Sequence, residues 1–347
     1  DGTTTNQNTP TQTFSLGTGR TAVAISSGED HTCAILDDGS VSCWGWNGYG
    51  QLGDGTNTDR NTPTQTSSLG TGRTAVAISS GRTHTCAILD DATVSCWGWN
   101  DKGQLGDGTT ADRNTPTQTS SLGTNTNPRT AVLSERDFDA DGILNIFDIH
   151  PYTNRPGFQE GYVYASTTLS SGGSHTCAVL DNGAVSCWGD ATYGQLGYGG
   201  TGDKATPRLT SSLGTGRTAV EIGSGGAHTC AILDNGAVSC WGMGTYGQLG
   251  NGGTNDKSNP TMTSSLGAGK TAISISSGVF RTCVILDSGD VSCWGFGNRG
   301  ALGNGGTADK TTPTLTSSLG TGRIAIAIST GGVHTCALLD NGSVSCW

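Results

Sequence analysis

The stretch His31-Thr-Cys-Ala-Ile-Leu-Asp-Asp-Gly-Ser-Val-Ser-Cys-Trp44 decides the fold of this 347-residue chain, because the chain contains it six times with small changes. Successive copies lie 53, 91, 53, 53 and 53 residues apart. A fixed period of about 50 residues is typical of repeat architectures, in which each repeat is one supersecondary unit. The copies use all 12 cysteines, which we expect to form six disulfides: Cys33 with Cys43, Cys86 with Cys96, Cys177 with Cys187, Cys230 with Cys240, Cys283 with Cys293, and Cys336 with Cys346.

Each repeat contains four short segments that predict strands. In the first repeat these are residues 21–26, 31–36 and 40–44, followed by a weaker segment at 64–66. Runs this short, bounded by Gly, Asn, Asp and Pro, are typical of strands rather than helices. The sequence therefore predicts an all-β fold with four strands in each repeat.

The turn between the second and third strands predicts a disulfide inside each hairpin. A three-residue loop that ends in Gly, such as 37–39, is typical of a type I turn closed by a Gly bulge. This loop places Cys33 directly opposite Cys43, at a separation that a disulfide can span. The second copy has Asp90-Asp91-Ala92 instead, so we expect its turn to be strained or different.

Composition limits the compartment and the partners. Cysteines that are even in number and paired locally predict an oxidising compartment, so we expect a secreted or cell-surface protein. The chain has no Cys-x-x-Cys pair of the kind that zinc sites use. A net charge of −10 argues against nucleic acid as a partner. No apolar run approaches the roughly 20 residues of a membrane-spanning helix.

A glycine-rich signature follows the hairpins. Residues 50–53, 103–106, 194–197 and 247–250 read Gly-Gln-Leu-Gly, and 300–303 read Gly-Ala-Leu-Gly. Together with Gly-x-x-His-Thr-Cys, Asp-Asn-Gly and Cys-Trp-Gly, this signature resembles the regulator of chromosome condensation repeat. The resemblance implies a β-propeller of four-stranded blades, commonly seven, and the paired cysteines resemble the secreted bacterial version of the repeat.

The number of blades is left open by the sequence. Six hairpins are present, and residues 1–2 align with 54–55 of the first repeat. The two ends of the sequence therefore belong to one blade. We expect either that they meet and close a six-bladed ring, or that the chain is part of a longer array.

Residues 129–166 interrupt the repeats and separate propeller segments 1–128 and 167–347. The insertion has the spacing of a calcium-binding loop, with oxygen-bearing side chains at loop positions 1, 3, 5, 9 and 12 and Gly at position 6. It resembles a thrombospondin type 3 or dockerin-type calcium repeat, and the alternative is an acidic surface loop. We expect a structural calcium ion bound by Asp137, Asp139, Asp141, the Ile143 carbonyl, Asn145 and Asp148.

Three series of residues recur once per repeat and favour structural roles. We expect each His that precedes a Cys, such as His31, to anchor its own blade, and each Trp that follows one, such as Trp44, to pack in or between blades. The cations after Gly-x-Gly, such as Arg20, and those after Asp, such as Arg60, are expected to pair with nearby Asp residues.

Residues that depart from the consensus form the candidate contact surface, namely Trp46, Trp99, Phe280, Arg281 and Arg299. No nucleophile–base–acid set, phosphate-binding loop or pair of acids stands out, so we expect no enzymatic activity. The predicted function is an extracellular structural or adhesive module that binds protein, including itself as a homo-oligomer or filament.

Other functions compete with this prediction. The chain could be a protein-binding propeller that inhibits a secreted enzyme, or a carbohydrate-binding module in which the extra Trp residues stack on glycans. Guanine-nucleotide exchange, the activity of the nuclear relatives, is disfavoured by the acidic, cysteine-paired chain. A carbohydrate hydrolase would require a cleft with paired carboxylates.

Overall fold

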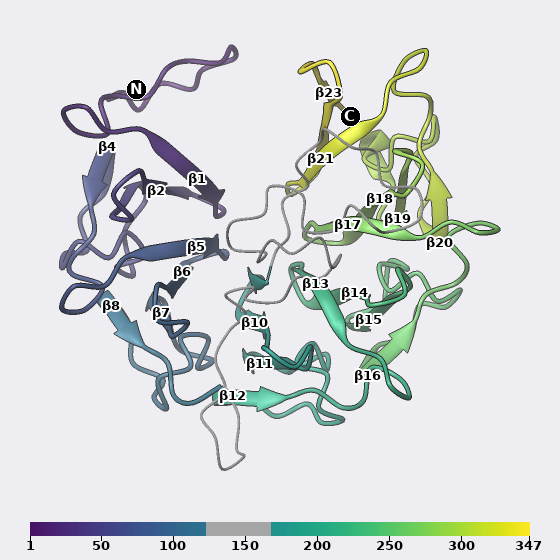
Figure 1. Cartoon of the computed structure of the whole chain (residues 1–347), viewed down its shortest axis with the longest axis horizontal. Coiled ribbons are helices and arrows are strands. Elements are labelled where there is room, and N and C mark those ends of the chain that lie inside the picture. Colours follow the sequence, from purple (N-terminus) through teal and green to yellow (C-terminus); the bar gives the residue numbers. More distant parts are fainter. Residues whose placement is uncertain (123–167) are drawn as a thin grey trace, which may run out of the picture.

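The computed structural model describes residues 1–122 and 168–347, which form six antiparallel sheets arranged as blades around one axis (Figure 1). Five of these blades have four strands, and the sixth has three. Within each blade, strands adjacent in sequence are adjacent in the sheet. The prediction of an all-β propeller is therefore confirmed, with six blades in the part of the chain that the structure describes.

The strand boundaries repeat closely from blade to blade. Blade 1 comprises β1 (Ala22–Ser27), β2 (His31–Leu36), β3 (Val41–Gly45) and β4 (Arg60–Gln65), and blade 2 comprises β5 (Ala75–Ser80), β6 (His84–Leu89), β7 (Val94–Gly98) and β8 (Arg113–Gln118). Blade 3 comprises β9 (Leu169–Ser171), β10 (His175–Val179), β11 (Val185–Gly189) and β12 (Lys204–Leu209), and blade 4 comprises β13 (Ala219–Ser224), β14 (His228–Leu233), β15 (Val238–Gly242) and β16 (Lys257–Met262). Blade 5 comprises β17 (Ala272–Ser277), β18 (Arg281–Leu286), β19 (Val291–Gly295), the 3-10 helix η1 (Asn298–Gly300) and β20 (Lys310–Leu315). Blade 6 comprises β21 (Ala325–Thr330), β22 (Thr335–Leu339) and β23 (Val344–Cys346).

The central hairpin of each blade has the predicted register. In blade 1, Cys33 pairs with Cys43 across β2 and β3, and the two form a disulfide with a Cα–Cα distance of 4.1 Å. The turn is closed by Gly39 with φ 75°, as a Gly bulge requires. Ala92 takes the same place in blade 2 with φ 64°, so the turn there is of the same kind but strained.

All six predicted disulfides are present, and each joins the second and third strands of one blade. In every bond the two cysteines are directly opposed in the strand register, at the same Cα–Cα distance of 4.1 Å. From blade 1 to blade 6 the bonds are Cys33 to Cys43, Cys86 to Cys96, Cys177 to Cys187, Cys230 to Cys240, Cys283 to Cys293, and Cys336 to Cys346. The predicted pairing is therefore confirmed at all 12 cysteines, including Cys86 and Cys96, whose turn lacks the Gly.

The hydrophobic core is divided among the junctions between neighbouring blades. At the junction of blades 3 and 4, Cys177, Val185 and Cys187 of one blade pack with Ile222 and Trp241 of the next. The same set of positions forms the cores of the other four junctions. Each disulfide except that of blade 6 is therefore buried in a core that two blades share. Trp97, Trp188, Trp241 and Trp294 are fully buried there, which confirms inter-blade packing for these four members of the series, whereas Trp44 of blade 1 is half-buried.

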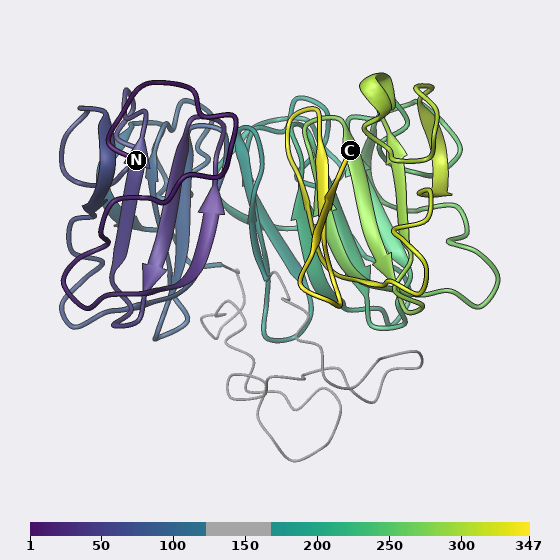
Figure 2. The same cartoon turned by 90° about the horizontal axis from the view of Figure 1, so that it is seen from above.

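Blades 1 and 6 do not form a sixth junction of this kind. Figures 1 and 2 show an open sector between β1 of blade 1 and β21–β23 of blade 6. Ile25 of β1 is 66% exposed, whereas its counterparts Ile222 and Ile275 are 0% and 5% exposed. Val344 of β23 is 63% exposed, whereas its five counterparts are each 1% exposed. The two faces that border the open sector therefore remain uncovered in the described structure.

Candidate interaction surface

A polar relay connects each blade to the next. Nε2 of His84 lies 2.9 Å from Oγ1 of Thr176 in the following blade, and that hydroxyl donates to the Gln104 carbonyl at 3.1 Å. Because the carbonyl can only accept, the Thr oxygen accepts from His, which must carry its proton on Nε2. The same relay recurs from His31, His175 and His228. The expectation that each His anchors its own blade is wrong, because it binds the next blade.

The relay histidines are neutral structural groups. Burial lowers the pKa of His31 and His175 to about 4. Burial, together with the neighbouring His175, lowers the pKa of His84 and His228 to about 3. An imidazole that resists protonation at neutral pH is a poor general acid, and each relay histidine lies in a different blade. The relay therefore holds neighbouring blades together through neutral imidazoles.

Arg281 replaces this histidine in blade 5 and does not belong to an exposed contact surface. Its relative exposure is 0%, so its inclusion among the predicted contact residues is wrong. Its Nε donates to Thr335 Oγ1 at 3.0 Å, and its terminal nitrogens donate to the carbonyls of Gly331, Gly332 and His334 in blade 6. Burial lowers the pKa of Arg281 to about 10, which keeps the guanidinium charged at neutral pH. Arg281 thus joins blade 5 to blade 6 through these hydrogen bonds.

The first aromatic cluster joins the loops of blades 1 and 2. Tyr49 stacks on Trp99 with ring centroids 5.3 Å apart, and it makes a T-shaped contact with Trp46 at a centroid distance of 5.4 Å. Trp46 is 37% exposed, while Tyr49 and Trp99 are half-buried. Both predicted Trp residues therefore lie together, through a tyrosine that sequence reasoning missed. The signal for it was the Tyr in Tyr49-Gly-Gln-Leu-Gly, which recurs at Tyr193 and Tyr246.

The second aromatic cluster joins blades 4 and 5. Tyr246 lies 4.9 Å from Phe280 and 5.2 Å from Phe296, between ring centroids. The cluster occupies the loops where second strands begin and third strands end, which is also the location of the first cluster. Both clusters therefore lie on one rim of the propeller. Arg299 is exposed in the adjacent loop of blade 5, with φ 60°, whereas Phe280 is half-buried.

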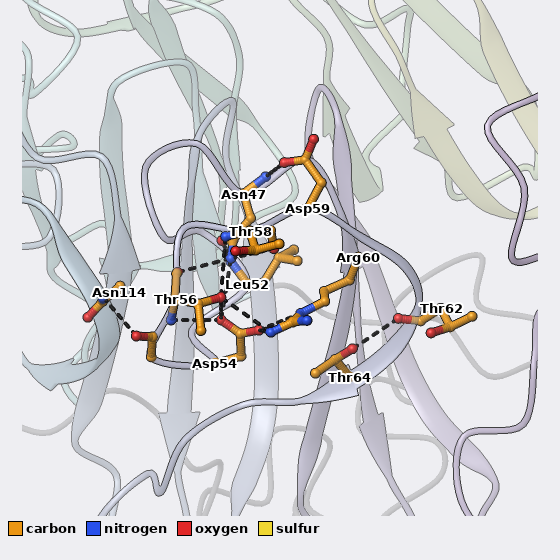
Figure 3. A network of polar contacts seen from close by, with 11 residues as sticks. Asn47, Leu52, Asp54, Thr56, Thr58, Asp59, Arg60, Thr62, Thr64 and Asn114 are labelled. Carbon is orange, nitrogen blue, oxygen red and sulfur yellow. Dashed lines mark hydrogen bonds and ion pairs between the residues drawn. The ribbon is translucent and has the colours of Figure 1, made fainter.

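A polar network holds the loop of the first cluster in place (Figure 3). The Asn47 side chain donates to the carbonyls of Thr56 and Thr58 and accepts from the Leu52 N–H. Asp54 accepts from Arg60 Nε at 2.7 Å. Burial acts to raise the pKa of Asp54, but hydrogen bonds from Thr56 and Arg60 outweigh it and hold this pKa below its usual value. The network fixes the loop to β4 and pairs the Asp54 carboxylate with the Arg60 guanidinium.

The cations after Gly-x-Gly all pair with nearby Asp residues, as predicted, whereas in the series after Asp the described structure pairs Arg60 and Arg113 in this way and places Lys204 over the ring of Tyr198. Arg20 pairs with Asp38 at 2.9 Å, and Arg113 pairs with Asp107 at 2.7 Å. Comparable pairs recur in other blades. A polar pocket of about 490 Å³ in blade 2 is lined by Arg73, whose guanidinium is likewise paired with Asp91 at 3.3 Å. The paired cations are thus neutralised by neighbouring carboxylates.

The predicted calcium loop lies outside the described residues, as does the whole insertion at 129–166. Within residues 1–122 and 168–347, no group of three or more His, Cys, Asp or Glu side chains could hold a metal ion. In the same part of the chain, no helix is long and apolar enough to cross a membrane.

Family models match most of this architecture. The model described as the regulator of chromosome condensation (RCC1) repeat matches residues 38–88, 91–132, 182–232, 235–285 and 288–338. The chain belongs to the RCC1 repeat family. A second RCC1 repeat model matches the strand segments of blades 1 to 5, at 22–51, 75–104, 167–195, 219–248 and 272–301.

Several RCC1 repeat proteins resemble the chain over most of its length. The ultraviolet-B receptor UVR8 of Arabidopsis thaliana is 29% identical over 342 residues, which cover 94% of this chain and 77% of UVR8. The human E3 ubiquitin-protein ligase HERC2 is 28% identical over 320 residues, or 92% of this chain. The chain spans only 6% of HERC2.

Solved structures of RCC1 repeat proteins share the fold. Human WBSCR16 superposes with a TM-score of 0.70 at 20% identity, covering 92% of this chain and 72% of that one. Yeast RCC1 (Prp20), solved bound to Kap60, superposes with a TM-score of 0.53 at 18% identity, covering 90% and 78%. At these identities the likeness shows the propeller fold alone.

Proposed function

We propose that this RCC1 repeat protein is a non-enzymatic, extracellular module that binds other proteins through the rim carrying the two aromatic clusters. The observation that carries the proposal is that each cluster bridges two neighbouring blades on the same rim. Aromatic residues that are rigidly held and partly exposed are enriched in protein interfaces. The relatives support a binding role: UVR8 is a receptor, and yeast RCC1 was solved in complex with Kap60.

The extracellular location is inferred from the disulfides. All 12 cysteines form six disulfides, and none is free. Disulfides persist in oxidising compartments and are rare in reducing cytosol. A structural or adhesive role at the cell surface, of the kind expected for a secreted bacterial repeat, fits this chemistry. Inhibition of a secreted enzyme and glycan binding remain the alternatives, and both would use the same rim.

Photo-crosslinking tests the rim. We expect a crosslinking amino acid at Trp46 to give a discrete adduct with a second protein in the native extracellular fraction of the producing cells. The matched control places it at Asp38, an exposed residue in the β2–β3 turn at the other end of the blade. Equal adducts from both positions would contradict the proposal. Binding to a glycan array that Trp46→Ala abolishes, without any protein adduct, would favour the carbohydrate-binding alternative.

We also propose that Asp137, Asp139, Asp141, Ile143, Asn145 and Asp148 bind one structural calcium ion. The spacing of these residues supports the proposal, and the affinity of a lone extracellular loop is expected to be about 10⁻⁴–10⁻³ M. In calorimetric titration of the full chain, we expect one site that Asp137→Asn together with Asp141→Asn removes. Calcium binding that is unchanged in this double variant would contradict the assignment.

A further inference from the structure

The rim that carries the aromatic clusters is the part of the repeat in which the blades differ from one another. The hairpin and the Gly-Gln-Leu-Gly loop are nearly the same in every blade, whereas three positions beside them vary. From blade 1 to blade 5, the position of Asp30 holds Asp, Thr, Ser, Ala and Phe, that of Trp46 holds Trp, Trp, Asp, Met and Phe, and that of Tyr49 holds Tyr, Lys, Tyr, Tyr and Arg. Positions that accept such different side chains are not fixed by the packing of a blade, so they are available for contacts with a partner.

Two carboxylates lie on either side of Trp46 in blade 1. The Asp30 carbonyl accepts the Trp46 N–H at 2.8 Å, and Asp59 Oδ1 accepts the N–H of the next residue, Asn47, at 2.8 Å. Both acidic residues are exposed, and neither forms an ion pair in the described structure. Figure 3 shows the Arg60 guanidinium turned away from Asp59. The charges of Asp30 and Asp59 are therefore open to a cation from a partner.

Two further carboxylates accompany Trp99 in blade 2. Asp112 Oδ1 accepts the N–H of Asn100, the residue after Trp99, at 2.8 Å, and Asp101 comes next in the chain. Both acidic residues are exposed, and neither forms an ion pair within residues 1–122 and 168–347. Partial burial, together with the charges of Asp112 and Asp190, raises the pKa of Asp101. Negative charge is thus concentrated beside this ring.

The cations near the first aromatic cluster are paired with acids in the described structure. The pairs are Arg60 with Asp54, Arg82 with Glu29, Lys102 with Asp203, and Arg113 with Asp107. These pairs leave Asp30, Asp59, Asp101 and Asp112 without a cation. This part of the rim therefore carries a net negative charge.

The second aromatic cluster has different surroundings. Phe280 takes the place of Asp30, and Asn298 takes the place of Asp101. Arg299 adds a cation at the position that holds a tyrosine in blade 4. Of the two clusters, the first therefore combines aromatic rings with an excess of carboxylates, and the two are suited to different ligands.

We propose that the first aromatic cluster and its four carboxylates bind a partner protein through a segment rich in Arg and Lys. Tyr49 contacts both Trp46 and Trp99, so the rings form one continuous patch. The faces of aromatic rings attract cations, and the planar guanidinium group of Arg also stacks on them. The carboxylates beside the rings attract the same groups and speed the encounter. The inference rests on the proposed function and names the chemistry of the partner that this rim binds.

A peptide probe tests the charge preference. Acetyl-Arg-Gly-Arg-Gly-Arg amide is titrated into the full chain by calorimetry, and the same peptide with Glu in place of Arg is the reversed probe. We expect the Arg peptide to bind, and Asp30→Ser together with Asp101→Thr to raise its Kd at least about fivefold. Blade 3 carries Ser and Thr at these two places, so the variant is expected to fold. An Arg peptide that does not bind, or a Glu peptide that binds more tightly, would overturn the proposal.

A matched control separates this surface from general attraction to an acidic chain. Asp37→Asn together with Asp90→Asn removes the same charge at the other end of blades 1 and 2, and we expect it to leave the Kd within about twofold. Trp46→Met installs the residue type of blade 4 and should weaken binding even at high salt, because it removes a ring face and no charge. Equal weakening by the two double variants, or no effect of Trp46→Met, would count against the proposal.

The photo-crosslink from Trp46 distinguishes failure of this inference from failure of the proposed function. We expect the protein adduct to be weakened when Asp30→Ser and Asp101→Thr are added. If the adduct persists unchanged, the rim binds protein without these carboxylates, and only the present inference fails. If no protein adduct forms with the parent chain, the proposed function itself fails.

Discussion

Lowering the pH from 6.5 to 4.5 is expected to destabilise the propeller steeply. Burial depresses the pKa of the four relay histidines to about 3 or 4, against 6.5 in the unfolded chain. Between these pKa values and 6.5, the four imidazoles therefore bind protons in the unfolded chain but not in the folded protein. The stability that depends on neutral imidazoles is complete above pH 6.5 and is lost as the pH falls toward the folded values. Four groups give a slope of about 5 kcal/mol per pH unit near pH 5.

The measurement is the free energy of unfolding, or the Tm, as a function of pH. His84→Gln removes one titrating group and is expected to reduce the slope by about a quarter. His334→Gln is the matched control, because His334 of blade 6 is exposed and should leave the slope unchanged. The pKa values of Asp54 and Asp107 are lowered, so protonation of these carboxylates reduces the free energy of unfolding mainly at more acidic pH. Their effect is therefore separate from that of the histidines between pH 6.5 and 4.5. A stability that is flat between pH 6.5 and 4.5 would contradict the prediction.

Removal of a central disulfide is expected to cost more than removal of the same bond in blade 6. Replacing Cys230 and Cys240 by Ala releases a short loop, worth about 2–3 kcal/mol in the chain-entropy model. It also leaves a void in the core that blades 4 and 5 share, since both sulfurs are fully buried. Voids of this kind add about 1–2 kcal/mol or more. We expect a total loss of about 4 kcal/mol.

The control is the equivalent double variant in blade 6, where Cys346 is exposed and Cys336 is half-buried. This variant should lose the stabilisation that comes from closing the loop but little packing. Its free energy of unfolding should therefore fall by about 2–3 kcal/mol. Repeat arrays need not unfold in one step, so amide hydrogen exchange of β14–β15 and of β22–β23 is the appropriate local measurement. Equal losses at the two sites would show that the disulfides act through chain entropy alone.

The hairpin could be predicted closely because its determinants are local. The ten-residue spacing and the Gly of the turn fix the pairing of Cys33 with Cys43, and β2 begins and ends where the sequence predicts. The fourth strand was harder. The sequence predicts this strand at 64–66, whereas β4 runs over Arg60–Gln65. Its residues are mostly polar, so they show little alternation of apolar and polar side chains, and its pairing partner is set by the fold.

Contacts between blades could not be predicted from a single repeat. Whether His31 binds its own blade or the next depends on how blades stack, and the sequence carries no local signal for that. The prediction that Arg281 is exposed was wrong for the same reason. A cation in place of His suggests an exposed side chain, but carbonyl groups of blade 6 accept its hydrogen bonds. The role of Tyr49 could not be predicted either, because only the fold shows that its ring contacts both Trp46 and Trp99.

Burial between blades also makes the six disulfides differ in their accessibility to reductants. The ten cysteines of blades 1 to 5 are each 0% exposed, so a thiolate from solvent cannot reach them without separating two blades. The sulfur at Cys346 has no such cover. In the described structure, attack by external thiols would therefore start at blade 6 and reach each further disulfide only after the neighbouring blade has separated.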